Sequence, residues 1–196
     1  IKRLYAISAQ GRRQEAAEEF RSSLIPDLER VLGPENRRTL VMRSNLALEL
    51  INLGRHEEAL KEYRTLLPLC TLALGAEDAT TLDVRVQRAD LLSTTDALDE
   101  AEAEFRQVLP LYARVRGAES PRVLRARLDF ASLLDDRGRL EDAAREFRQV
   151  AAAIPPGSPP QPLGLLRQDA RCGLAQMLEQ QGRHAEAEKE LRAALP

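Results

Sequence analysis

Apolar and small residues recur along this chain at helical spacing. Ala59, Tyr63 and Leu66 stand at i, i+4 and i+7, which places them on one face of a helix. A second helical pattern precedes them and ends just before Gly54, as helices commonly end before a glycine in the left-handed conformation. No stretch alternates apolar and polar residues over a strand's length. The pattern therefore predicts paired helices and no sheet.

The pair of helices is repeated along the chain. The segment 11–21 returns at 54–64 and 138–148, and weaker copies at 96–106 and 182–192 lack the glycine or the aromatic residue. Its central alanines are spaced by 43, 42, 42 and 44 residues: Ala16, Ala59, Ala101, Ala143 and Ala187. A Leu-Gly-x-Glu marker, with Arg116 in place of Leu in its third copy, recurs in phase with them, 42 residues apart. Independent markers that share one period identify a structural repeat.

Each repeat is predicted to hold two helices, A and B. Asn36, Asp78 and Ser120 recur 42 residues apart, and each can accept a hydrogen bond from a free amide of the first turn of helix A. Helix A then runs to about residue 53, 94 or 136. Helix B continues to the Leu-Gly marker, over roughly 18 residues or about 27 Å.

The buried positions alternate between small and large residues. Ala47 and Ala59 are expected to face each other where the two helices cross. One aromatic slot per repeat fills the gap to the next hairpin: Phe20, Tyr63, Phe105 and Phe147. Since neither helix buries its apolar stripe alone, stacked neighbours must complete the core. We predict an all-α solenoid of stacked antiparallel helix hairpins.

The spacing of Ala47, Gly54, Ala59 and Tyr63 resembles the tetratricopeptide (TPR) repeat. The TPR period is 34 residues, whereas this one is 42, and a helix B longer by about two turns explains the difference. The longer unit is similar to the repeats of kinesin light chains and of bacterial signalling proteins; HEAT repeats share the period but not the Gly-to-aromatic spacing. The resemblance implies a single TPR superhelix over 1–196 with about 4.5 repeats: a half repeat at 1–33, then 36–75, 78–117, 120–157 and 163–196.

Proline and arginine each recur at a fixed position of successive repeats, and we call each such set a column. Pro26, Pro68 and Pro110 lie inside helix B and predict that it bends, since each removes a helical hydrogen bond. The proline-rich segment 155–162 is expected to be extended and irregular, either as a hinge or as a rigid loop. An arginine column replaces the usual aromatic of helix A and is expected to form a ladder between repeats or to reach the groove: Arg43, Arg85, Arg127 and Arg171.

Charge and composition narrow the classes of function. Basic and acidic residues number 29 and 31, and the net charge of −2 argues against nucleic-acid or membrane-surface binding. The nearly apolar run 66–76 is too short to span a bilayer. Two cysteines suit a reducing compartment, and the scarcity of lysine suggests a high-GC bacterium. We expect a cytoplasmic, bacterial protein.

We find no motif for catalysis, a metal or a cofactor. The sequence contains no glycine-rich phosphate loop, zinc-ligand spacing or nucleophile motif. His56 and His184 occupy the same turn position of different repeats, where many residue types are tolerated. We therefore predict that the chain is not an enzyme and carries neither cofactor nor metal.

The remaining candidate site is the concave face that helix A lines in TPR proteins. Its predicted residues stand at matching positions of successive repeats: Asn45, Leu48, Asn52, Gln87, Asp90, Thr94, Asp129, Ser132, Asp136 and Gln180. Amides and hydroxyls there can bond the backbone of an extended peptide, and the aspartates favour a basic partner. We predict a scaffold that binds a protein or peptide, as a monomer or a weak end-to-end dimer.

A second interpretation remains open. The array can instead be a ligand-responsive sensor segment of a larger multidomain signalling protein, packed on a neighbouring domain until a ligand releases it. The first residue, Ile1, and the short last helix B motivate this alternative.

Overall fold

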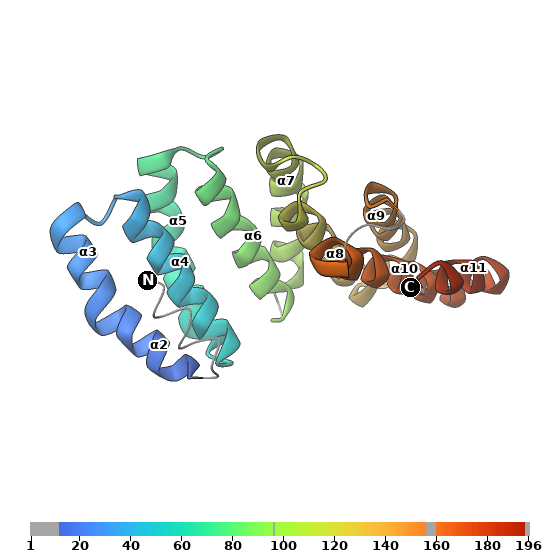
Figure 1. The fold of residues 1–196 in the computed structure, drawn as a ribbon, viewed down its shortest axis with the longest axis horizontal. Coiled ribbons are helices and arrows are strands. Elements are labelled where there is room, and N and C mark those ends of the chain that lie inside the picture. The colour runs from blue at the N-terminus through green and yellow to red at the C-terminus, as the bar shows by residue number, and fades with distance from the viewer. Residues whose placement is uncertain (1–11, 96, 156–159, 195–196) are drawn as a thin grey trace. The chain divides into compact units, whose positions relative to one another are not determined.

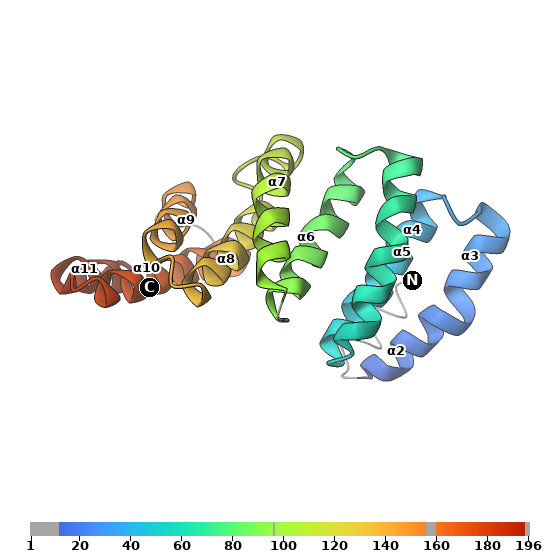
Figure 2. The ribbon, with the colours of Figure 1, turned by 180° about the vertical axis from the view of Figure 1, so that it is seen from behind.

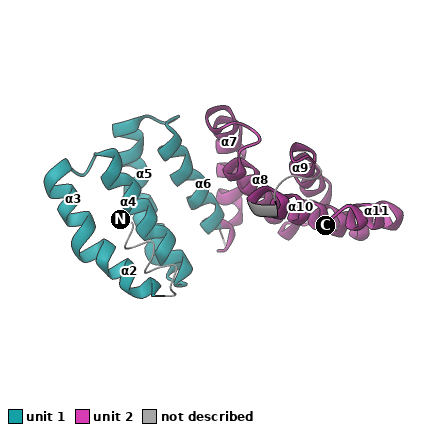
Figure 3. Ribbon diagram, in the orientation of Figure 1, with its two compact units in different colours: residues 1–92 teal, residues 93–196 magenta. Residues whose placement is uncertain are grey.

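The computed structural model describes residues 12–95, 97–155 and 160–194, and these ranges contain helices and no strand. The chain divides into two compact units, residues 1–92 and 93–196 (Figure 3). The helices confirm the predicted all-α class. The prediction of one domain over the whole chain stays a prediction.

Unit 1 is built from an N-terminal helical segment, one full helix pair and a further helix A (Figure 1). Helices α4 and α5 pack as an antiparallel hairpin, and the preceding segment packs on α4. In chain order the elements are α2 (Arg13–Glu19), the π-helical turn η1 (Phe20–Leu24), α3 (Ile25–Leu32), α4 (Arg37–Asn52), α5 (His56–Leu74) and α6 (Ala79–Ser93).

Unit 2 contains two full hairpins, α8–α9 and α10–α11, preceded by a helix B (Figure 2). Helix α10 packs against α9, α11 and α8, so the second hairpin leans on the first. The elements are α7 (Leu98–Arg116), α8 (Pro121–Asp136), α9 (Leu140–Ala153), the π-helical turn η2 (Pro160–Gly164), α10 (Leu165–Gln180) and α11 (His184–Ala194).

The predicted helix boundaries are confirmed. Asn36 Oδ1 accepts a hydrogen bond from the Arg38 amide at 2.9 Å, and Asp78 Oδ1 accepts one from the Thr80 amide at 2.8 Å. Each bond satisfies a donor that the first turn cannot pair internally. At the other end of α4, Gly54 has a φ of +73°, a conformation that favours glycine.

The predicted core is also confirmed. Ala47 and Ala59 are completely buried, which lets α4 and α5 approach closely. The four residues of the aromatic slot are between 0% and 7% exposed, so they are packing residues: Phe20, Tyr63, Phe105 and Phe147. In unit 2 the Phe105 ring packs against Phe130 of the following helix A, with 5.5 Å between the ring centroids.

The prolines behave in two ways. Helices α5 and α7 continue through Pro68 and Pro110 without interruption, and the bend predicted there stays a prediction. Pro26 instead follows η1, where hydrogen bonding switches to the wider π pattern. The expectation of an extended connector over 155–162 is wrong for residues 160–162, which belong to the π-helical turn η2. The reason is that the fixed φ of proline suits the first turn of a helix. The rest of the proline-rich segment, residues 156–159, lies outside the described residues.

The arginine column corrects a prediction. The arginines join the two helices of one hairpin, and each observed carboxylate partner is the glutamate 19 residues later. Arg43 and Arg127 also donate to a second residue of the same helix B, Thr65 and Gln149. Arg43 Nε donates to Glu62 Oε1 at 2.6 Å, and Arg127 Nη1 donates to Glu146 Oε2 at 2.6 Å. Arg171 pairs in the same way with Glu190, and Arg85 occupies the matching position on α6. The column is therefore a ladder within hairpins, because helix B of the same hairpin offers each of these three arginines a carboxylate within hydrogen-bond distance.

Candidate functional site

In unit 1 the predicted site residues lie on α4 and α6. Asn45, Leu48 and Asn52 follow one another along α4, and Asn52 is exposed whereas the other two are half-buried. Gln87 and Asp90 lie half-buried on α6. The structure brings the two helices together through a side-chain hydrogen bond, in which Ser44 Oγ donates to Gln87 Oε1 at 2.7 Å.

In unit 2 the predicted residues lie on α8 and at the end of α10, which pack against each other. Ser132, Asp136 and Gln180 are exposed, and Asp129 is half-buried. Thr94 is exposed between α6 and α7. Each unit thus carries part of the predicted surface, which we call the helix-A face.

The first position of the helix-A face lies over the aromatic slot of the preceding hairpin. In unit 1, Tyr63 Oη donates to Gln87 Oε1 at 3.4 Å, and burial raises the pKa of that phenol. In unit 2 the same position is Gly173, where an added Cβ would stand 2.5 Å from the Phe147 ring. This position is therefore partly committed to packing between hairpins, and the two later positions are the more accessible ones.

Sequence reasoning missed polar residues that connect α8 with α10. Gln176 Nε2 donates to Asp135 Oδ2 at 3.4 Å. About two turns earlier along α10, Asp169 lies 3.6 Å from the guanidinium of Arg125, with both side chains about half exposed. Asp135 stands three residues after Ser132, and Gln176 stands four residues before Gln180, so this spacing would have placed both on the same face as the predicted residues.

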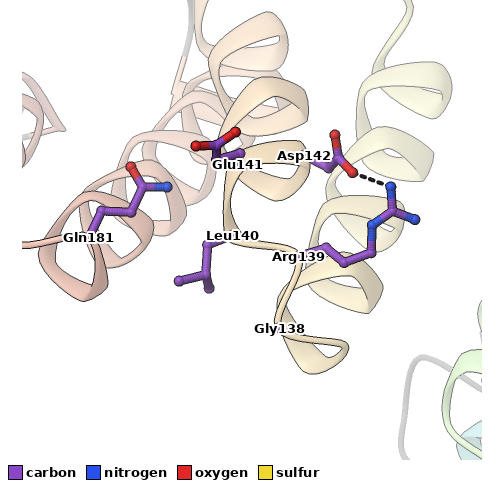
Figure 4. A pocket seen from close by; sticks show the side chains of 6 residues that line it. All are labelled: Gly138, Arg139, Leu140, Glu141, Asp142 and Gln181. Carbon is purple, nitrogen blue, oxygen red and sulfur yellow. Dashed lines mark hydrogen bonds and ion pairs between the residues drawn. The ribbon is translucent and has the colours of Figure 1, made fainter.

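A second hollow surface lies on the helix-B side of unit 2. A pocket of about 420 Å³ is lined by the turn that begins α9 and by one residue of the α10–α11 turn. Figure 4 shows Leu140 and Glu141 extending toward Gln181, whereas the ion pair of Arg139 with Asp142 lies on the opposite side of α9. Two consecutive hairpins therefore form the walls of this pocket.

An adjoining pocket of about 240 Å³ shares Glu141 and Gln181 with the first. Its remaining walls carry three arginines, and the buried Ala144 lies among them: Arg145 and Arg148 from α9, and Arg183 from the α10–α11 turn. We call this second pocket the arginine pocket.

The arginines of this pocket are held to different degrees. Arg183 donates to both carboxylate oxygens of Glu186, at 2.8 and 2.7 Å, and this hydrogen bonding lowers the pKa of Glu186. Arg145 pairs with Asp142 at 3.1 Å. Arg148 also lowers the pKa of Glu186 through its charge, yet it forms no hydrogen bond or ion pair within the described ranges. Its guanidinium is available to a ligand.

The same described residues offer little for metal binding or covalent chemistry. They contain no group of three or more metal-ligating side chains, and no helix among them is long and apolar enough to cross a membrane. Both cysteines are free thiols. Cys70 is buried, and desolvation raises the pKa of its thiol to about 11, so it is a poor nucleophile at neutral pH.

Family models match most of the chain. The model described as tetratricopeptide repeat matches residues 38–112 and 80–154, and a second model of the same description matches residues 168–195. The chain belongs to the tetratricopeptide repeat family. This membership confirms the resemblance carried by Ala47, Gly54, Ala59 and Tyr63.

Several solved structures share the fold. A kinesin light chain type protein of nearly identical TPR-like repeats from Podosopora anserina is 20% identical with a TM-score of 0.79, covering 98% of this chain and 90% of that one. BtubC (BKLC) from P. vanneervenii is 19% identical with a TM-score of 0.72, covering 95% and 70%. MamA from Desulfovibrio magneticus RS-1 is 14% identical with a TM-score of 0.65, covering 98% and 89%. A search of curated proteins found no match.

Proposed function

We propose that this TPR protein is an interaction scaffold that holds an extended segment of a partner protein on its helix-A face. TPR arrays serve in general as scaffolds for protein–protein interaction. The finer proposal, binding along the helix-A face, is supported by one observation in unit 2. Exposed polar side chains stand one turn apart on two helices that pack side by side, Ser132 and Asp136 on α8 and Gln176 and Gln180 on α10.

The chemistry of this face suits a polypeptide backbone. Hydroxyl and carboxamide groups both donate and accept hydrogen bonds, so they can pair with peptide groups whatever the partner's side chains are. The described part of the face contains no Trp or Tyr, the residues that most often anchor tight interfaces. Affinity therefore depends on many modest contacts spread over several helix turns.

Carboxylates give the face its selectivity. Asp129 and Asp136 lie on α8 in unit 2 and Asp90 lies on α6 in unit 1, and each favours a partner segment with Lys or Arg. Surface charges mainly change the association rate and its dependence on salt. A basic partner should therefore bind more weakly as the ionic strength rises.

The experiment compares partner capture by the wild-type chain and by the double variant Asp129→Lys, Asp136→Lys. Both proteins are immobilised, exposed to a lysate of the source cell, and the retained proteins are quantified by mass spectrometry. We expect the double variant to lose most of a basic partner, since two attractive contacts become repulsive. Proteins retained equally by both are background.

Glu119→Lys is the matched control, because Glu119 is an exposed carboxylate of unit 2 in the connector that precedes α8. It changes the net charge in the same direction outside the helix-A face. Equal capture by the wild type and the double variant, with both folded by circular dichroism, would rule out the helix-A face of unit 2 as the binding site.

A further inference from the structure

Positive side chains outnumber negative ones among the residues that line the arginine pocket. Three arginines and one carboxylate, Glu141, line it. Arg145 and Arg183 keep partners of their own, Asp142 and Glu186, which fix the direction of each guanidinium. A guanidinium held in this way can still donate its remaining N–H groups to a second acceptor.

Gln181 adds a neutral donor to the same pocket. Its Oε1 atom accepts a hydrogen bond from Arg183 Nη1 at 3.3 Å, which orients the carboxamide. With the oxygen engaged, the Nε2 amide is the group left for a ligand. The pocket thus offers donors from two consecutive hairpins to an acceptor placed between them.

At the matching position of unit 1 the arginine already has a carboxylate partner. Arg21, which aligns with Arg148, donates to Glu58 at 3.0 Å and so joins η1 to α5. Glu18 aligns with Arg145, so a carboxylate stands where unit 2 has a cation. The general architecture of the repeat therefore does not produce the arginine pocket, which depends on the side chains of α9.

We propose that the arginine pocket binds a phosphate group through Arg148, with Arg145, Arg183 and Gln181 as further donors. A phosphate dianion presents three oxygens, and arginine pairs with such oxygens through two parallel hydrogen bonds. The volume of about 240 Å³ accommodates one phosphate group with its water. The group belongs to inorganic phosphate or to a phosphorylated side chain of a partner, and the two sources share this recognition chemistry.

The test measures three ligands on the full 196-residue chain: inorganic phosphate, a fluorescent phosphoserine peptide, and the same peptide with serine. Binding is followed by anisotropy and by amide NMR shifts. We expect shifts at the start of α9 and at Gln181–Arg183, and binding that weakens with added sodium chloride. A phosphopeptide that binds more tightly than phosphate identifies a phosphorylated partner, and the reverse identifies free phosphate.

Variants of the pocket should change affinity in opposite directions. Arg148→Ala should weaken phosphate binding about tenfold or more, because a hydrogen-bonded charge is lost. Arg148→Lys keeps the charge but not the paired donors, so its affinity for phosphate should lie between those of the wild type and Arg148→Ala. Glu141→Gln removes the one carboxylate that lines the pocket, and it should strengthen binding by about twofold to fivefold at low salt.

Arg64→Ala is the control, since Arg64 is an exposed arginine at the same repeat position of α5. Three results would each overturn the proposal: no binding of either phosphate ligand, unchanged affinity in Arg148→Ala, or equal loss in Arg64→Ala. Since all of these variants lie off the helix-A face, their outcome is independent of the partner-capture experiment.

Discussion

The two units follow the same repeat but differ where helix B meets the turn of the next hairpin. In unit 1, Arg21 pairs with Glu58 across this junction. In unit 2, Arg148 stands at the same repeat position and stays unpaired among the described residues, while Arg145 replaces the acidic Glu18. The repeat therefore determines the position of a side chain on the surface, whereas the residue type, and with it the charge, differs between the units.

Inside the hairpins the units agree. The pairs Arg43–Glu62 in unit 1 and Arg127–Glu146 in unit 2 have the same spacing, the same distance and similar exposure, between 15% and 21%. The aromatic slot is buried in both. Positions that hold two helices together repeat closely, whereas positions that face solvent vary, because only the former share one packing environment.

The largest effect on stability should come from placing in unit 2 the residue that lies over the aromatic slot in unit 1. Gly173→Gln places in unit 2 the residue type that unit 1 has at Gln87, and it should lower the free energy of unfolding by about 3 kcal/mol, because the Phe147 ring already fills the space. Denaturant unfolding measures the change. Adding Phe147→Ala should recover part of the loss; unchanged stability in the single variant would show that α9 and α10 can separate freely.

The arginine–glutamate ladder within the hairpins should contribute equally to the stability of both units. Glu62→Ala and Glu146→Ala each remove the carboxylate partner of a half-buried arginine and should cost about 1–2 kcal/mol in chemical denaturation. Glu15→Ala removes a carboxylate whose ion pair with Arg12 is more than half exposed, and its effect should be near zero. A clear difference between the two ladder variants would mean that the units do not share this interaction.

The helix caps should give unit 1 a dependence on acid that the cap of unit 2 lacks. The hydrogen bond from Arg37 lowers the pKa of Asp78 to about 2, whereas Ser120 at the matching position does not titrate. Because the folded pKa is below the unfolded value of about 3.9, the stabilisation is present above pH 4 and is lost as the pH falls toward 2.

Asp78→Asn keeps a side chain that can cap the helix but removes this charge. It should lower the stability by about 1 kcal/mol at neutral pH and flatten its dependence on pH between about 4 and 2. Thermal unfolding across this range compares the variant with the wild type. The same slope in both proteins would assign the acid sensitivity to other carboxylates.

The smallest effect, a gain of weak phosphate binding, should come from making the junction of unit 1 more positive, like that of unit 2. Glu18→Arg combined with Glu58→Gln supplies a second cation and releases Arg21 from its ion pair. If the arginine pocket binds phosphate for the reasons given, the double variant should bind a second equivalent weakly, and calorimetry should detect it. Binding of one equivalent only would show that the surrounding turn, and Gln181 in particular, is indispensable.

Most of the fold could be predicted because its determinants are local and periodic. A cap such as Asn36, a turn glycine such as Gly54 and a small residue such as Ala59 act through the backbone within a few residues, so the sequence displays them directly. The pairing of Arg43 was predicted wrongly, although Glu62 and its counterparts always follow 19 residues later. The sequence holds that signal, but choosing between two possible partners requires the distance between helices.

The surface was less predictable. Ser132 and Asp136 were placed on the helix-A face because they match the positions of helix A that line the groove in TPR proteins, yet the same reasoning did not show that Gln87 is engaged by Ser44 and Tyr63. The arginine pocket combines one face of α9 with a turn more than 30 residues later along the chain. Such contacts depend on how one hairpin leans on the next, and no local pattern encodes that angle.

The π turn η1 accounts for the one irregular interval at the start of the array. Phe20 precedes Pro26 by six residues, whereas Tyr63 precedes Pro68 by five, so the first helix B contains one extra residue where Phe20–Leu24 lies. A π turn accommodates such an insertion without rotating the rest of the helix out of phase. The array can therefore gain a residue in mid-helix and keep the apolar stripes on both sides aligned with their neighbours.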